Sequence, residues 1–389
     1  MSNGSDDVVA TPGFLRSHLG GASVVASSIA LWMLTTWTAA WSKGFPPFRS
    51  SSWDRWDSAN YLAIADRGYE LYRCTDATWG HLPGDWCGNA GWFPGFPAIM
   101  RLLRWNGLAD VTNGWLISTL ALIGAFTVLW VWLLRDLPAI QSLPAMALAA
   151  VFPSSVYYGA VFPVSLAVLS AVSMLALLRR ERWLLAGMCG TVAAVVYPSG
   201  LLVGAAALAP LLSPRLGDWR RRIVATVQIG APIAVAYALV LVQYQVRVGY
   251  WDAWFKNQAN NHYDRVLPIE TLWRSWEKVA ERTAPWVGAQ ALFTATLVVA
   301  ATVVTLRRRR ELEPLDIAIL AMTLVMWLAP LTIGVGFSHY RADAFVLPLV
   351  VLLARSRWRW MPHATVALAV IAAIIAFNMA QLFFIAVLI

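Results

Sequence analysis

Charged residues are scarce in this sequence. Asp, Glu, Lys and Arg make up 13% of the 389 residues, and hydrophobic residues make up 59%. About a quarter of the residues of a soluble domain are charged. The shortage excludes an ordinary soluble protein and predicts an all-α polytopic membrane protein with a single transmembrane domain over residues 1–389.

Lysine is rarer still. Only Lys43, Lys256 and Lys278 are lysines, although the net charge is +9. The positive charge comes from arginines that cluster in short segments between apolar runs, so it does not indicate nucleic-acid binding. An excess of Arg over Lys, together with abundant Ala and Trp, is associated with GC-rich bacterial genomes.

Patterns for metal and nucleotide binding are missing. The sequence has no phosphate-binding P-loop, dinucleotide fingerprint or serine nucleophile motif. Its histidines show no paired spacing and no neighbouring cysteine ligands, and they are His18, His81, His262, His339 and His363. We therefore expect neither a metal nor a cofactor.

The apolar runs predict about eleven transmembrane helices, at roughly 20 residues each. Two short helices that dip into the membrane and return are expected around the breaker at Tyr197-Pro198-Ser199-Gly200. The predicted spans are 21–41, 115–134, two within 138–178, two within 183–212, and then 223–246, 286–306, 315–335, 344–354 and 365–388.

The arginines predict the orientation. One side of the predicted topology collects Arg-dense short loops, whereas the other carries two long loops, 42–110 and 247–285, in which Arg and Lys are mixed with acids. Because short loops rich in Arg and Lys stay in the cytoplasm, we expect a plasma-membrane protein with a cytoplasmic N-terminus and both long loops outside. Each long loop should contain an interfacial amphipathic helix.

Two of the three cysteines share the first long loop. If that loop faces an oxidising compartment, Cys74 and Cys87 either form a disulfide or remain free, and our prediction is the disulfide. Cys189 lies in an apolar run and is expected to be a small core residue.

The stretch WDRWDSANYLAIADRGY (53–69) carries the main candidate site. With Ser52 as N-cap, a helix would place Asp54 in its first turn and Asp57 on the same face, and Gly68 would end it. A carboxylate among Trp side chains suits general-base activation of a hydroxyl. The alternative is an interfacial helix in which Asp54 only answers the helix dipole.

Nucleotide sugars and ATP are absent outside the cell, so an outward-facing enzyme needs a donor carried by a lipid. A phosphate leaving group requires a cation, and Arg341 is the best candidate because it precedes a span too short to cross alone. The alternative role for Arg341 is a contact with Asp343 or with a lipid headgroup. His339 and Lys256 are secondary candidates.

The first long loop resembles a known family. WDSANYLAIADRGY (56–69), followed by WFPGFP (92–97), is similar to the outer-loop pattern of the GPI mannosyltransferase II (PIG-V type) family. The resemblance implies the GT-C fold and inverting transfer of mannose from a polyprenyl-phosphate donor to a lipid or glycan acceptor. Asp57 would be the base, with Trp56, Asn60 and Tyr61 around the sugar or acceptor.

The pattern also departs from the family. Asn60 stands where the family often has His, Phe162-Pro163-Val164 lacks an acid, and Tyr197-Pro198-Ser199-Gly200 lacks an Arg. A bacterium makes no GPI, so another acceptor is expected. Two other functions stay open, namely a transporter or flippase of lipid-linked saccharides and a catalytically inactive assembly partner.

Overall fold

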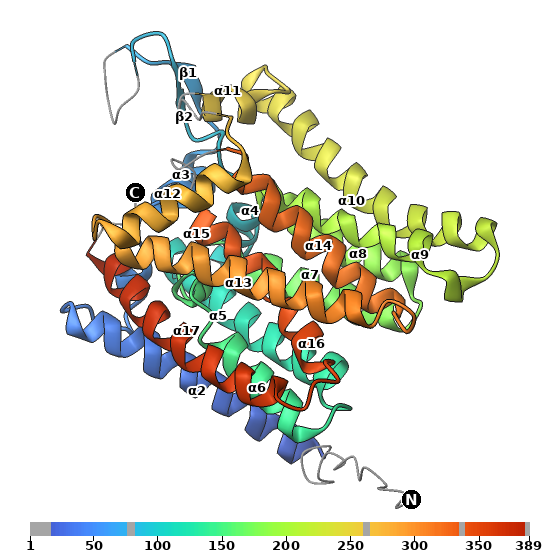
Figure 1. Cartoon of the computed structure of the whole chain (residues 1–389). Helices are drawn as coiled ribbons and strands as arrows, with labels where there is room; N and C mark the ends of the chain where they lie inside the picture. Colours follow the sequence, from blue (N-terminus) through green and yellow to red (C-terminus); the bar gives the residue numbers. More distant parts are fainter. Residues whose placement is uncertain (1–16, 76–81, 260–264, 334–338, 386–389) are drawn as a thin grey trace, which may run out of the picture.

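Long apolar helices build the molecule. The computed structural model describes residues 17–75, 82–259, 265–333 and 339–385, and six helices within them are long and apolar enough to cross a membrane. The all-α polytopic membrane fold is therefore confirmed (Figure 1). The six are α2 (His18–Ser42), α5 (Asp110–Val128) with its π-helical extension η3 (Leu129–Leu134), α10 (Trp219–Val248), α13 (Pro285–Arg307), α14 (Pro314–Leu331) and α17 (Met361–Phe384).

Shorter helices occupy the remaining apolar runs. As expected around the breaker at 197–200, one helix ends at Val196 and the next begins at Pro198. The total of eleven spans stays a prediction, because the length of these helices alone does not show which of them cross the membrane. They are α6 (Ala139–Ala150), η4 (Ser155–Tyr158), α7 (Val164–Arg179), α8 (Trp183–Val196), η5 (Pro198–Ala207), α9 (Leu208–Leu212), η6 (Pro214–Leu216), α15 (His339–Ala342), η7 (Asp343–Val346) and α16 (Leu349–Ala354).

The first and last long helices run side by side in the same direction. Helices α2 and α17 pack together, and Gln381 near the end of α17 donates a hydrogen bond to Ser42 at the end of α2 (2.9 Å). If α2 and α17 cross the membrane in the same direction, the number of crossings from α2 to α17, both included, must be odd. This direction agrees with the predicted topology, in which the chain begins and ends on opposite sides.

Small residues let the helices approach closely. Helix α8 packs between α7 and α10, and a Cβ on Gly187 would collide with the backbone of Ile229 in α10. Gly190 sits one turn further along, against the side chains of Ile233 and Met174. Membrane helices commonly pack through such small residues, because lipid offers no hydrophobic drive for association.

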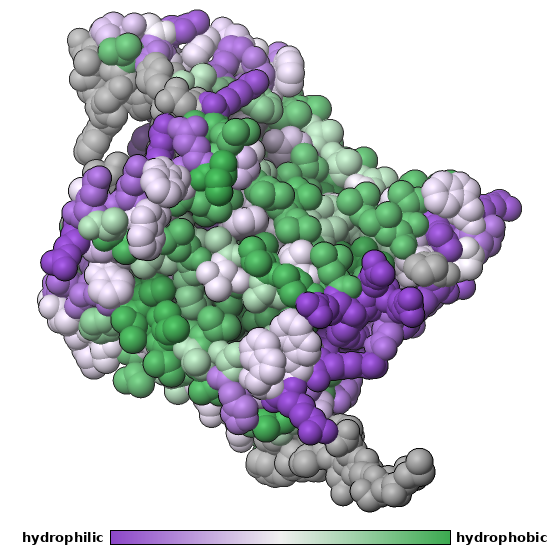
Figure 2. Space-filling model, viewed as in Figure 1, coloured by the Kyte–Doolittle hydropathy of each residue, from purple (hydrophilic) through white to green (hydrophobic). Residues whose placement is uncertain are grey.

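Apolar residues cover the middle of the visible surface, and hydrophilic residues gather towards two ends (Figure 2). This band is what a protein embedded in a bilayer requires. One hydrophilic end contains the segments of the two long predicted loops. They are η1 (Ser50–Trp53), α3 (Ser58–Arg67), β1 (Leu71–Arg73), β2 (Trp86–Gly88), α4 (Gly95–Leu102), η2 (Leu103–Asn106), α11 (Ala253–Ala259) and α12 (Pro268–Ala280).

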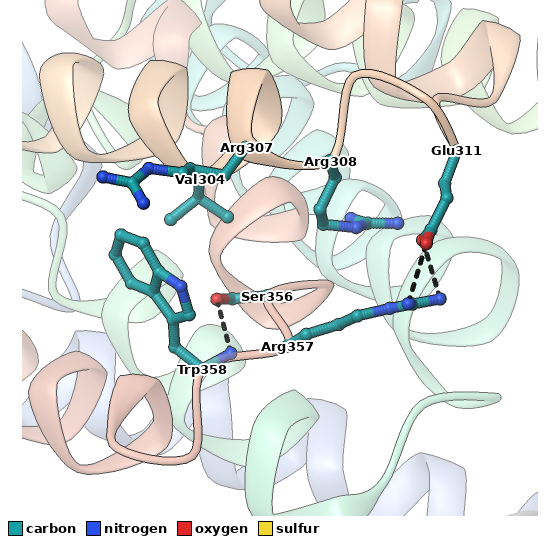
Figure 3. A pocket seen from close by; sticks show the side chains of 7 residues that line it. All are labelled: Val304, Arg307, Arg308, Glu311, Ser356, Arg357 and Trp358. Carbon is teal, nitrogen blue, oxygen red and sulfur yellow. Dashed lines mark hydrogen bonds and ion pairs between the residues drawn. The ribbon is translucent and has the colours of Figure 1, made fainter.

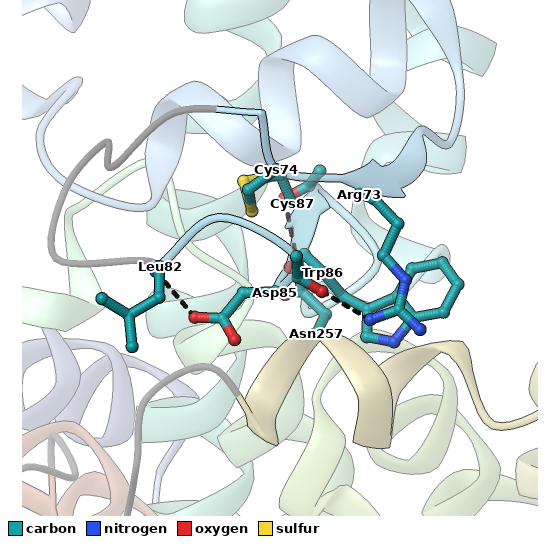
Figure 4. The surroundings of a disulfide bond; sticks show 9 residues. Arg73, Cys74, Leu82, Asp85, Trp86, Cys87 and Asn257 are labelled. Atoms are coloured by element: carbon teal, nitrogen blue, oxygen red, sulfur yellow. Dashed lines mark hydrogen bonds between the residues drawn. A yellow bond between two sulfur atoms is a disulfide. The ribbon is translucent and has the colours of Figure 1, made fainter.

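A disulfide closes a small antiparallel hairpin in the first loop. Strands β1 and β2 pair with Tyr72 opposite Cys87, and Cys87 is bonded to Cys74, with their Cα atoms 5.2 Å apart (Figure 4). The predicted disulfide is therefore confirmed. Beside it, the guanidinium of Arg73 lies over the ring of Trp86 at 3.9 Å.

The second loop docks onto this hairpin. Asn257 in α11 donates a hydrogen bond to the carbonyl of Gly88 (3.3 Å). Gly91 leaves room for the Asn257 side chain, because a Cβ on Gly91 would collide with the Asn257 amide. The two long segments therefore form one assembly, as expected if both lie on the same side of the membrane.

Helix α12 buries polar side chains and exposes apolar ones, which is the opposite of a helix on the surface of a soluble protein. Its polar residues Thr271 and Ser275 are buried, and Thr271 donates to the carbonyl of Leu331 (2.7 Å). Trp273 and Trp276 are 61% and 51% exposed on the other side. Its exposed indoles are typical of an interfacial helix, which the sequence predicted for this loop.

The orientation can be tested by labelling. In a Cys189→Ala background, Asp66→Cys and Glu281→Cys should react with a membrane-impermeant maleimide on intact cells, whereas Arg309→Cys should react only after permeabilisation. All three positions are exposed. Labelling of Arg309→Cys on intact cells would reverse the orientation.

Candidate active site

The structure joins two residues that the sequence singled out separately. Arg341 donates through Nη1 to Oδ2 of Asp57, and the two form an ion pair although 284 positions separate them. Their side chains are 20% and 27% exposed, so the pair is partly shielded from water yet accessible. The predicted base and the predicted phosphate-binding cation therefore share one site.

Asp57 reaches Arg341 because the chain turns sharply just before it. Trp56 has a φ of +57°, a conformation that costs a non-glycine residue about 1–3 kcal/mol. Its indole Nε1 donates to the carbonyl of Phe383 in α17 (3.2 Å), which helps hold the turn. Asp57 is the N-cap of α3, yet its side chain does not cap the helix and is bonded to Arg341 instead.

The predicted helix start is wrong. Ser52 does not cap a helix that contains Asp54 and Asp57, because both acids precede α3, which begins at Ser58. Ser52 Oγ instead donates to the carbonyl of Pro46 (2.8 Å), and the buried indole of Trp53 donates to that of Pro47 (2.7 Å). These two bonds anchor a short 3₁₀ turn that ends at Trp53. The predicted end is right, since Gly68 caps α3 with φ +91°.

Two arginines, Arg101 in α4 and Arg104 in η2, anchor the other end of α3. Arg101 donates to the carbonyls of Ile64 (2.7 Å) and Ala65 (2.9 Å), and Arg104 also donates to Ala65 (3.0 Å). The last carbonyls of a helix have no partner within it, and a cation there also suits the helix dipole. Arg101 and Arg104 therefore fix the helix whose first residues form the site.

Arg341 keeps unused hydrogen-bonding capacity. Its Nε is buried and has no hydrogen-bond partner in the part of the chain that the structure describes. The guanidinium carbon lies 5.8 Å from the centroid of the Phe162 ring, and the preceding Tyr340 stacks on Tyr157 (6.1 Å). A guanidinium with a free edge can bind an oxyanion such as phosphate.

One glutamine ties the Arg341 segment to α13. Gln290 is fully buried, and its Nε2 donates to the carbonyl of Tyr340 (2.7 Å), to Ser154 Oγ (3.1 Å) and to Asp343 Oδ2 (3.4 Å). The alternative expectation for Arg341, a pair with Asp343, does not hold, since Arg341 pairs with Asp57 and Asp343 accepts from Gln290. Gln290 was not among the predicted site residues, although a lone amide in an apolar run is itself a signal.

Loss of this amide should loosen the Arg341 segment. Gln290→Leu would leave the carbonyl of Tyr340 and the carboxyl of Asp343 buried without this donor, at a cost of about 1–3 kcal/mol. The midpoint of thermal unfolding in detergent should fall accordingly. Thr296→Ala, an exposed position on the same helix, is the matched control and should leave the midpoint unchanged. An unchanged midpoint in Gln290→Leu would contradict the assigned role.

Asp54 occupies a different environment from Asp57. It is half-buried and forms no hydrogen bond or ion pair within the described residues. Burial raises the pKa of its carboxyl, and the nearby charge of Arg55 opposes that shift. The Arg55 guanidinium lies 4.3 Å from the Phe45 ring centroid. Asp54 is thus a second carboxylate near the site, without the contact to Arg341.

The predicted sugar-binding residues differ in how deeply they are buried. Tyr61 is 3% exposed and lies edge-on to Phe96 (5.6 Å) and Phe162 (6.2 Å). Burial raises its pKa well above the ordinary value, so its hydroxyl stays protonated. Tyr61 and the guanidinium of Arg341 therefore both lie near the ring of Phe162. Asn60 and Trp56 are half-buried.

The secondary cations do not share one location. Lys256 lies in α11, where it pairs with Asp252 and faces the rings of Tyr250 (4.9 Å) and Trp86 (5.8 Å). It belongs to the outer hairpin assembly, and its described contacts do not include Asp57 or Arg341. His339 begins α15, two residues before Arg341, and its side chain lies outside the described part of the structure.

The described residues contain no group of three or more His, Cys, Asp or Glu side chains arranged to hold a metal ion.

Comparisons with known proteins identify the fold. No protein-family model matches the sequence, and no curated protein matches it. A solved structure of the archaeal oligosaccharyltransferase AglB from Archaeoglobus fulgidus, in complex with an inhibitory peptide and a dolichol-phosphate, matches with a TM-score of 0.50 at 11% identity. The match covers 93% of this chain and 55% of that one.

A second structure, of the oligosaccharyltransferase from the same organism with zinc and sulfate, matches with a TM-score of 0.48 at 12% identity, over 92% of this chain and 53% of that one. The chain thus spans about half the length of the proteins it matches. The comparisons do not show the PIG-V type family. What they show is that this is an all-α polytopic membrane protein with a GT-C-type fold.

Proposed function

We propose that this protein is a membrane glycosyltransferase that moves a sugar from a polyprenyl-phosphate donor to a hydroxyl of a lipid or glycan. The observation that carries the proposal is the ion pair between Asp57 and Arg341. It sets a carboxylate for the acceptor beside a cation for the leaving group.

The reaction needs both charges. As the acceptor oxygen attacks the anomeric carbon, its proton passes to the Asp57 carboxylate. The bond between the anomeric carbon and the phosphate oxygen breaks, and the polyprenyl phosphate leaves with the bonding electrons. Arg341 stabilises the negative charge that develops there.

The donor phosphate and Asp57 compete for the same guanidinium. Without donor, the hydrogen bond from Arg341 occupies Oδ2 of the Asp57 carboxylate. A bound phosphate would take over hydrogen bonds of Arg341 and leave Asp57 free to accept a proton. The acceptor hydroxyl is then activated only when a donor is in place.

The identities of the sugar and the acceptor are inferred from other observations. The resemblance of residues 56–69 and 92–97 to the PIG-V type pattern favours mannose and inversion at the anomeric carbon. The matched AglB structure contains a dolichol-phosphate and a peptide, which is a precedent for a lipid-phosphate ligand on this fold. By the charge rule, we place the site on the extracytoplasmic face of the plasma membrane.

The test is transfer of radiolabelled mannose from polyprenyl-phosphomannose in membranes that contain the protein, with Asp57→Asn membranes as the control. Label should enter a lipid or glycan product only with the unaltered protein. Label that crosses the membrane still attached to its polyprenyl phosphate would instead indicate a flippase. Equal incorporation with both proteins would remove Asp57 from the proposal.

A further inference from the structure

The hydrophilic end opposite the hairpin contains a pocket. It lies where α13 ends and the turn between α16 and α17 begins, and its volume is about 180 Å³ (Figure 3). Its lining combines three arginines with an apolar side and includes Val304, Arg307, Arg308, Glu311, Arg357 and Trp358. None of them contributes to the site of Asp57 and Arg341.

The positive charge of this pocket is poorly neutralised. Glu311 is the acid that lines it, and Arg357 already holds both of its carboxylate oxygens (2.7 and 2.8 Å). Within the described residues, the side chains of Arg307, Arg309 and Arg310 have no ion pair or hydrogen bond, so the run 307–310 carries excess charge. A solvated loop would also be basic, so the charge alone does not define a ligand.

Arg308 supplies a more specific observation. Its side chain is 15% exposed, its nearest acid is Asp316 at 4.0 Å, and its Nε is buried with no hydrogen-bond partner in the described part of the chain. A buried donor without an acceptor is uncommon in folded proteins. An oxyanion in the pocket would supply that acceptor, and guanidinium groups bind phosphate oxygens in pairs.

The surroundings favour a phosphate that belongs to a lipid. Val304 is 2% exposed and Trp358 packs on the core, so the inner side of the pocket is apolar. On α13, Val299 and Val303 are 56% and 39% exposed. Val303 lies four residues and Val299 eight residues before Arg307, and therefore on the same helix face. Acyl chains can follow that face while the headgroup reaches the arginine.

We propose that this pocket binds the phosphate headgroup of one anionic phospholipid, whose acyl chains lie along α13. Basic pockets between membrane helices are known to take such headgroups. The site is independent of the proposed glycosyl transfer.

Native mass spectrometry of the detergent-solubilised full chain can test this. With phosphatidylglycerol, the protein should retain one lipid more tightly than with phosphatidylcholine. Because each arginine near an anionic lipid contributes a factor of about five in affinity, Arg307→Gln should weaken retention about fivefold and Arg307→Gln/Arg357→Gln about 25-fold. Both arginines are exposed, so the variants should fold, and gel filtration will verify this.

The matched control is Arg220→Gln/Arg221→Gln, which removes the same charge from exposed arginines at the start of α10 and should keep the lipid. Equal loss in both double variants would overturn the site in favour of a general charge effect. Equal retention of phosphatidylcholine would overturn the need for an anion. Displacement of the lipid by millimolar inorganic phosphate would overturn the lipid assignment in favour of a free oxyanion.

Discussion

Asp57→Asn should lower the rate of sugar transfer by about 10²- to 10⁴-fold, the usual contribution of a general base. Asn matches Asp in shape and can still accept a hydrogen bond from Arg341, but it cannot take the proton from the acceptor hydroxyl. The variant should therefore express and fold. The measurement is the initial rate of transfer from polyprenyl-phosphomannose at saturating donor.

Asp54→Asn is the matched control for this prediction. Asp54 lies three residues away and has no contact with Arg341, so its loss should lower the rate much less. The reverse order, with Asp54→Asn inactive and Asp57→Asn active, would assign the base to Asp54, whose pKa is raised by burial. Full activity in both variants would leave the site without a catalytic carboxylate.

Arg341→Ala should weaken donor binding by about 30- to 4000-fold, since removal of one partner of a shielded, charged hydrogen bond costs about 2–5 kcal/mol. Arg341→Lys keeps the charge but lacks the planar fork, so we expect an intermediate loss of about tenfold. The measurement is the KM for polyprenyl-phosphomannose. An unchanged KM in Arg341→Ala would place the phosphate elsewhere, with Lys256 the next cation to test.

The sequence indicates the two halves of the site but not their union. Asp57 stands out because its motif is rich in Trp and acids, and Arg341 because an ionisable residue borders an apolar run. Nothing local to either residue shows that they meet, since their 284-residue separation is bridged only by the packing of the helices. Only the fold could place the proposed base and the proposed cation together.

The errors have local physical causes. The helix expected from Ser52 fails because Ser52 and Trp53 bond back to the carbonyls of Pro46 and Pro47, and because Trp56 adopts a positive φ. Helix propensity cannot foresee such side-chain bonds. Lys256 could have been interpreted better, since Asp252 lies four residues before it on the same helix face.

The most direct test of the account is equilibrium binding of sugar-free polyprenyl phosphate to the purified protein, to Asp57→Asn and to Arg341→Ala. If phosphate and Asp57 compete for Arg341, neutralising Asp57 removes a competitor. Asp57→Asn should then bind about tenfold more tightly than the unaltered protein, equal to about 1.4 kcal/mol, while Arg341→Ala binds far more weakly. Equal or weaker binding by Asp57→Asn would contradict the competition on which the proposed site depends.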